Sequence, residues 1–185
     1  MMRWLVVLIS GVVLAACSAA VERSHASGSI ITLFGQIGVV DRANVDPVVE
    51  PLFGTLGVEF DTALGLNYES LAALQQHSIR TDFPLGGEHH VFRGPRLHDV
   101  LAVALPEGDM VRVTALDGYQ RDISMERIEQ DGVILAISRN GIPLGLGGLG
   151  PTMLVWPRGE DPALAEMSDD DWVWGILTLE VRSPA

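Results

Sequence analysis

The chain has 185 residues, of which 48% are apolar, a length and composition that suit one domain with a substantial core. Its formal net charge of −12 repels nucleic-acid phosphates, so nucleic acid is excluded as a partner. All twelve basic residues are arginine, which excludes a lysine Schiff base or a lysine general base. Twenty glycines and few long helical periodicities favour a β-rich α+β fold.

The N-terminus has the pattern of a secretory signal peptide, because Arg3 precedes a short apolar run at residues 4–16. That run is too short to span a bilayer, which takes about 20 residues. Its end, Leu14-Ala15-Ala16-Cys17, resembles the bacterial lipoprotein cleavage box, which implies that Cys17 carries lipid. The alternative is ordinary cleavage after Ala20, and both alternatives predict an exported protein.

This pattern divides the chain into residues 1–16 as signal peptide, 17–29 as tether and 30–182 as one domain. The predicted location is the periplasm or, through the lipid on Cys17, the outer membrane. The membrane is then contacted only through that anchor. Because Cys17 is the only cysteine, the domain has no disulfide, thiolate metal ligand or cysteine nucleophile.

Along the domain, alternation of apolar and polar residues predicts a series of strands separated by turns. The predicted strands lie at residues 30–37, 58–60, 77–83, 88–92, 110–115, 119–123, 133–138 and 172–181. Asp117-Gly118 is typical of a tight turn, so the strands on either side of it are predicted to form a hairpin.

Three helices are predicted between these strands. Asn67 can cap a helix at residues 68–76, and Gly94-Pro95 can start a second helix. The second helix has one apolar face, formed by Leu97, Val100, Leu101 and Ala104. A third helix is predicted at residues 125–130, whereas residues 38–57 form either a loop or a short helix around 48–53.

Residues 139–157 are unusually rich in glycine. The turn dipeptide Asn140-Gly141 is followed by a loop with Gly145, Gly147, Gly148 and Gly150. A fold retains so many glycines where backbone approaches backbone or a ligand closely, and the alternative is a plain surface connection. The acidic residues that follow, 158–171, are predicted to be solvated and mobile.

Arginine and histidine residues suggest two kinds of site. Arg80, Arg93 and Arg96 could form an anion cradle at the predicted helix start. The alternative is that they are ordinary surface side chains paired with Asp82, Glu88 and Asp99. The histidines do not predict a metal site, because adjacent residues on a strand project to opposite faces. The histidines of this region are His77, His89, His90 and His98.

Two further groups have both a functional and a structural interpretation. Asp117, Tyr119 and Asp122 could line a cleft as acid, base or hydrogen-bonding groups, or Asp117 could simply satisfy the backbone of its own turn. The tryptophans Trp156, Trp172 and Trp174 could stack on a flat ligand, or they could pack in the core. Alternation places Trp172 and Trp174 on one face of their predicted strand.

Several segments together resemble a known family. They are Phe92-Arg93-Gly94-Pro95-Arg96-Leu97, Ala115-Leu116-Asp117-Gly118-Tyr119, Asn140-Gly141-Ile142-Pro143-Leu144, Gly150-Pro151 and Trp172-Val173-Trp174. Their order and spacing resemble the oxidoreductase molybdopterin-binding domain of the sulfite oxidase fold, in its small exported bacterial form. The resemblance covers roughly residues 28–181.

This resemblance implies a single domain of mixed β structure with short helices that holds a pterin cofactor. It also implies a set of cofactor-binding residues and leaves the catalytic residues unknown. The implied set is Arg80, Arg93, Arg96, Asp117, Tyr119, Asn140, Gly148, Gly150 and Trp156. In the family, a cysteine thiolate binds the molybdenum and lies on the segment before the helix near Arg96. The corresponding residues here, 77–83, include no cysteine.

Three interpretations of function therefore stay open, one of which is a purely structural envelope lipoprotein. In the first, the chain has lost the molybdenum ligand, carries no cofactor, and binds a small molecule or a membrane-associated signalling or redox partner. In the second, it is a molybdopterin-dependent oxidoreductase with unusual metal ligation. The glycine-rich loop lacks the lysine of a P-loop, and no serine–histidine motif appears, so no hydrolase or nucleotidase is predicted.

Overall fold

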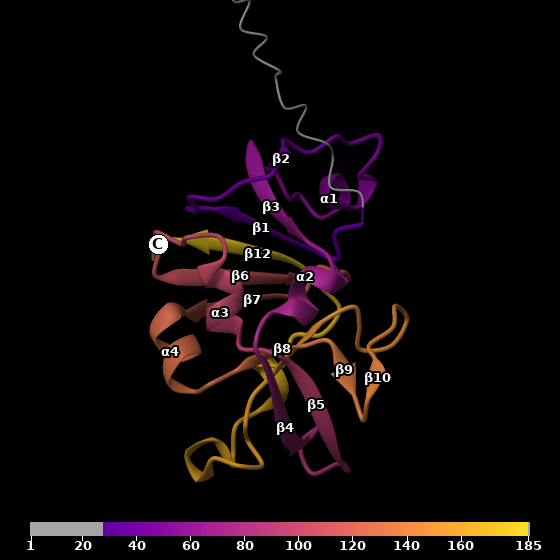
Figure 1. The fold of residues 1–185 in the computed structure, drawn as a ribbon, viewed down its shortest axis with the longest axis vertical. Coiled ribbons are helices and arrows are strands. Elements are labelled where there is room, and N and C mark those ends of the chain that lie inside the picture. Colours follow the sequence, from indigo (N-terminus) through magenta and orange to yellow (C-terminus); the bar gives the residue numbers. More distant parts are fainter. Residues whose placement is uncertain (1–27, 185) are drawn as a thin grey trace, which may run out of the picture.

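A computed structural model describes residues 28–184 of the chain (Figure 1). The predicted signal peptide, the predicted lipidation site Cys17 and nearly all of the predicted tether lie outside the described residues. Within residues 28–184, no helix has the length and apolar character needed to cross a membrane.

The largest element is a six-stranded sheet in the order β2-β3-β1-β12-β6-β7 (Figure 1). Its strands are β1 Ile31–Gly35, β2 Arg42–Ala43, β3 Thr62–Leu66, β6 Met110–Ala115, β7 Gln120–Ser124 and β12 Ile176–Arg182. β1 and β12 pair in parallel, so the first and last strands of the domain lie side by side. All other neighbours in this sheet are antiparallel.

Two smaller sheets complete the β structure. A four-stranded sheet has the order β10-β9-β5-β4, and β11 pairs with β8. These strands are β4 Gln76–Asp82, β5 His89–Pro95, β8 Ile134–Ala136, β9 Ser138–Arg139, β10 Ile142–Pro143 and β11 Met153–Val155. In Figure 1 the β4–β5 hairpin extends to the end of the molecule opposite α1, whose bounds are Pro51–Thr55.

The other helices are short, and side-chain caps fix where two of them start. α2 Tyr68–Ala73 begins after Asn67, whose side chain accepts the Ser70 amide at 2.8 Å. α4 Met125–Gln130 is capped by Ser124 in the same way. The remaining helices are α3 Leu97–Ala102 and the 3₁₀ turns η1 Pro162–Leu164 and η2 Asp169–Asp171. The predicted α+β class, strand-rich with short helices, is confirmed.

One hydrophobic core joins all three sheets. It contains Leu33 and Val113 from the six-stranded sheet, Phe92 from the four-stranded sheet and Leu135 from β8, all fully buried. A smaller cluster under α1 contains Phe34, Phe53, Val58 and Ala63.

Local patterns predicted several elements well. The β6–β7 hairpin and α4 are confirmed, as is the Asn140-Gly141 turn, where both residues have positive φ, 51° and 78°. The alternative of a short helix within residues 38–57 is confirmed by α1. These elements depend on neighbouring residues only, which explains the agreement.

Two element predictions were wrong because tertiary packing overrode the local pattern. Residues 58–60 are not a strand: the strand is β3, and Phe60 packs against the rings of Phe34 and Phe53. Pro95 does not start a helix, because it pairs with Gln76 at the end of β5 and α3 begins only at Leu97.

Gly94 marks the closest approach of β5 to β8. A Cβ added at Gly94 would lie 2.0 Å from the carbonyl oxygen of Leu135 and 2.8 Å from the Cα of Ala136. Both atoms belong to the backbone, which cannot move aside as a flexible side chain could. Glycine is therefore required where the two sheets meet.

We expect Gly94→Ala to lower the free energy of unfolding by about 1–3 kcal/mol, because the added methyl group overpacks the β5–β8 contact. Gly54→Ala, in α1, is the matched control. A Cβ there meets nothing within 4 Å, so the control should gain about 0.5–1 kcal/mol. Urea unfolding of both variants measures the difference, and equal midpoints would contradict the assigned contact.

Candidate functional site

A cleft of about 330 Å³ opens beside the turn between β6 and β7. Side chains from three separate parts of the chain line it: Phe83, Ala115, Asp117, Tyr119, Asp169, Asp170, Trp172, Val173 and Trp174. We call it the aromatic cleft. Its volume lies at the lower end of the range for small-molecule sites, roughly 300–1,000 Å³.

The β6–β7 turn positions Asp117 and Tyr119. The Asp117 carboxylate accepts the Tyr119 amide at 3.0 Å, so Asp117 stabilises its own turn as well as lining the cleft. The Tyr119 hydroxyl donates to the carbonyl oxygen of Asp170 at 2.9 Å. This bond fixes the phenol ring against η2.

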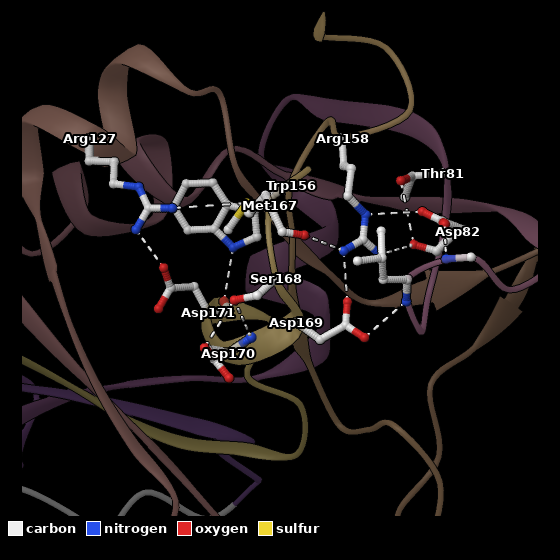
Figure 2. A network of polar contacts seen from close by, with 12 residues as sticks. Thr81, Asp82, Arg127, Trp156, Arg158, Met167, Ser168, Asp169, Asp170 and Asp171 are labelled. Atoms are coloured by element: carbon white, nitrogen blue, oxygen red, sulfur yellow. Dashed lines mark hydrogen bonds and ion pairs between the residues drawn. The ribbon is translucent and has the colours of Figure 1, made fainter. Parts of the chain in front are cut away.

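The other wall is formed by a segment that was predicted to be solvated and mobile. Most of residues 159–170 are exposed as predicted, but the two ends of the segment are buried. The Arg158 side chain is only 2% exposed, and Asp171 is buried as well. Figure 2 shows the Arg158 guanidinium lying between Asp82 and Asp169. The segment 158–171 is therefore fixed to the body by ionic contacts.

Arg158 makes four polar contacts. Its Nε and Nη2 donate to the carboxylate and the carbonyl oxygen of Asp82, both at 3.0 Å. Its Nη1 donates to the Asp169 carboxylate at 2.7 Å and to the Met167 carbonyl oxygen at 2.8 Å. The guanidinium also lies 4.4 Å from the centre of the Trp172 ring, which stacks on Phe83. Arg158 thus supports the inner wall of the aromatic cleft from behind.

A second arginine–tryptophan pair is formed by Arg127 and Trp156, which Figure 2 draws on the other side of the 168–171 segment from Asp82. The Arg127 guanidinium covers the Trp156 ring at 4.4 Å and pairs with Asp171. The Trp156 indole N–H donates to the Asp171 carbonyl oxygen at 2.9 Å. Because Trp156 is fully buried, it packs in the core and leaves no ring face for a ligand.

The two other tryptophans differ in exposure, contrary to the prediction of a shared face. Trp172 is 1% exposed and Trp174 is 43% exposed. The reason is that β12 starts only at Ile176, so strand alternation does not apply to residues 172–174. The Trp172 indole nitrogen is buried without a hydrogen-bond partner in the described part of the chain.

The predicted arginine cradle is only partly assembled. In the β4–β5 hairpin, Arg80 of β4 lies opposite Val91 of β5, and Val91 is two residues from Arg93. The side chains of Arg80 and Arg93 therefore project from the same exposed face of the hairpin. Arg96 follows β5 and lies against Gly132, in a separate hollow. The alternative is correct in part: all three arginines are exposed, but they are not paired with Asp82 or Asp99, because Asp82 binds Arg158 and Asp99 contacts His98.

The glycine-rich loop forms a hollow of its own. Asn140 and Gly148 line this hollow of about 220 Å³, which does not include the residues of the aromatic cleft. Asn140 also accepts the Val91 amide at 2.9 Å. A Cβ at Gly150 would lie 2.3 Å from the Leu144 carbonyl oxygen, so this glycine serves a backbone contact.

Among the described residues, no group of three or more histidine, cysteine, aspartate or glutamate side chains has an arrangement that could hold a metal ion. In the stretch 77–83, where the resemblance implies a thiolate, Thr81 is fully buried and Asp82 is engaged by Arg158. Neither side chain supplies a soft ligand of the kind that a cysteine offers.

Sequence patterns found Asp117 and Tyr119 but missed Phe83, Asp169 and Asp170 as members of the cleft. The aspartates lie in an acidic run that has the composition of a solvated loop. Their place in the site depends on Arg158, which gives no local signal in the sequence.

Comparison with known proteins shows a likeness of fold. No family model matches the chain, and no curated protein matches it. Among solved structures, it is similar to the sulfane dehydrogenase SoxCD from Paracoccus pantotrophus, with a TM-score of 0.53 and 18% identity. The match covers 82% of this chain and 37% of that one, so this chain spans little more than a third of its length. The likeness shows a distant relationship of fold alone.

We expect Arg158→Met to lower the free energy of unfolding by about 3–5 kcal/mol, because it leaves the Asp82 carboxylate without its buried partner. Arg112→Met is the matched control, since the Arg112–Asp122 pair is 33% and 42% exposed. The control should lose less than about 1 kcal/mol. Chemical denaturation of both variants measures the two losses, and losses of equal size would refute the role assigned to Arg158.

The acid stability of the protein should depend on Asp82. Burial alone would raise the pKa of Asp82, but the Gly86 amide and the Arg158 guanidinium together lower it below its ordinary value of 3.8. A carboxyl with a lowered pKa stabilises the fold above its ordinary value, and this stabilisation is lost as the pH falls through the folded-state pKa.

We therefore expect the free energy of unfolding to fall as the pH drops below about 4, and to fall less steeply in Asp82→Asn. Urea midpoints measured from pH 2 to pH 6 give both slopes. An acid slope unchanged in the variant would show that other carboxylates, such as Asp122, carry the effect.

Proposed function

We propose that this chain is a small-molecule-binding module built on a sulfite-oxidase-type fold, and that its ligand binds in the aromatic cleft. This proposal rests on the set of residues that line the cleft. Residues from two segments of the family resemblance, 115–119 and 172–174, line one hollow together with Phe83 from the end of the stretch 77–83. The likeness to the sulfane dehydrogenase supports the sulfite-oxidase-type fold.

The residues at this place do not fit a molybdenum–pterin cofactor. The thiolate ligand is missing, because residues 77–83 include no cysteine. The cleft itself is lined by three carboxylates, Asp117, Asp169 and Asp170, and by no arginine. Carboxylates repel the phosphate group that such a cofactor carries. The donor set and the charge thus both favour a binding module over a molybdenum enzyme.

The same proposal places the module in the cell envelope. The signal-peptide pattern and the Leu14-Ala15-Ala16-Cys17 box support export and a lipid anchor on Cys17. Anchored in this way, the module presents its ligand to a membrane-associated signalling or redox partner.

Elemental and pterin analysis tests the proposal. The full chain should be exported from a bacterial host that makes molybdenum cofactor, purified in folded form and analysed for both components. We expect far less than one molybdenum and one pterin per chain, because the cleft offers neither a thiolate nor a positive charge.

A cysteine variant provides the matched control. Thr81→Cys returns a thiol to the stretch 77–83, and the same analysis then reports whether the missing ligand alone prevents loading. Molybdenum and pterin near one per chain in the natural sequence would overturn the proposal in favour of an oxidoreductase with unusual ligation.

A further inference from the structure

We propose that the aromatic cleft takes a small organic cation, such as a quaternary or protonated amine; this inference rests on the proposed ligand-binding function. Three features support it: uncompensated carboxylates, exposed aromatic rings, and a volume that suits a small molecule. Each follows from contacts made by the residues in the cleft wall.

The carboxylates leave the cleft with an excess of negative charge. Asp169 pairs with Arg158, but Arg158 also pairs with Asp82, so one positive charge is shared by two carboxylates. Asp117 accepts only the amide of its own turn, and Asp170 accepts the Ser168 hydroxyl at 3.0 Å. Neither Asp117 nor Asp170 is in an ion pair within residues 28–184. Arg121, which pairs with Asp171, offsets part of the charge of Asp170, so Asp117 attracts a cation more strongly than Asp170 does.

Exposed aromatic rings are the second feature that favours a cationic ligand. Tyr119 and Trp174 line the cleft and are 44% and 43% exposed, so each has ring surface that a ligand can reach. The negative face of an aromatic ring attracts a cation within about 6 Å of the ring centre. Rings beside carboxylates favour a cation with apolar substituents, whose methyl groups contact the rings while its charge faces the carboxylates.

The same features disfavour other ligands. An anion meets three carboxylates and no arginine in the cleft lining. A neutral molecule gains the aromatic contact but nothing from the charge. The order of affinity should therefore be cation, then neutral molecule, then anion, for ligands of one shape.

Three probes of nearly the same shape test this order: choline, 3,3-dimethyl-1-butanol and 3,3-dimethylbutanoate. They carry charges of plus one, zero and minus one. Titration calorimetry of the full chain should give an affinity for choline at least about fivefold higher than for the alcohol, and weaker binding still for the carboxylate. Added salt should weaken choline binding and leave the alcohol unchanged.

Variants of residues in the cleft lining test whether choline binds in the aromatic cleft. Asp117→Asn and Asp170→Asn keep an oxygen for the existing hydrogen bonds and remove only the charge, so each should weaken choline binding about two- to fivefold. Trp174→Ala should weaken it about tenfold. The control Glu129→Gln also removes one negative charge, but from an exposed side chain of α4 that does not line the cleft. It should leave choline binding unchanged.

Equal affinity for choline and the alcohol, tighter binding of the carboxylate, or no binding of any probe at millimolar concentration would each overturn the inference. These outcomes are distinct from failure of the proposed function. That function fails when molybdenum and pterin are found at stoichiometric levels, a readout that does not depend on the charge of a probe.

Discussion

The buried guanidinium of Arg158 is the interaction on which the candidate site depends. It joins Asp82, at the end of β4, to the segment 158–171, although the two lie 76 residues apart in the chain. Its contact with Asp169 sets one wall of the aromatic cleft, and its contact with Trp172 supports another. A buried charge is stable only while its partners stay in place, so the cleft walls are held in one arrangement.

The cleft is formed by side chains from three separate parts of the chain. Its position, where separate segments of the fold converge, is the kind of place where ligands bind in many folds. Fold alone does not determine chemistry, which depends on the side chains that reach the site. Here those side chains are aromatic rings and carboxylates, so the site is suited to recognition by stacking and by charge.

Much of the fold could be predicted from local patterns, and the site only in part. The β6–β7 hairpin and α4 follow from alternation, a turn dipeptide and a cap, all within a few residues. The burial of the ends of segment 158–171 could not be predicted, because Asp171 binds Arg127, 44 residues away, and Arg158 binds Asp82, 76 residues away. Asp117 and Tyr119 were predicted as site residues since their own turn displays them, whereas Phe83 required the tertiary fold.

Two exposed arginines place like charges on one face of the β4–β5 hairpin. Arg80 and Arg93 project from the β4–β5 hairpin, at the end of the molecule opposite α1, and neither is in an ion pair within residues 28–184 (Figure 1). The Glu160 side chain, from the acidic segment 158–171, accepts the Arg80 amide at 2.8 Å and so brings a carboxylate to the same hairpin. The surface of the hairpin therefore carries charges of both signs, and added salt weakens the forces between them.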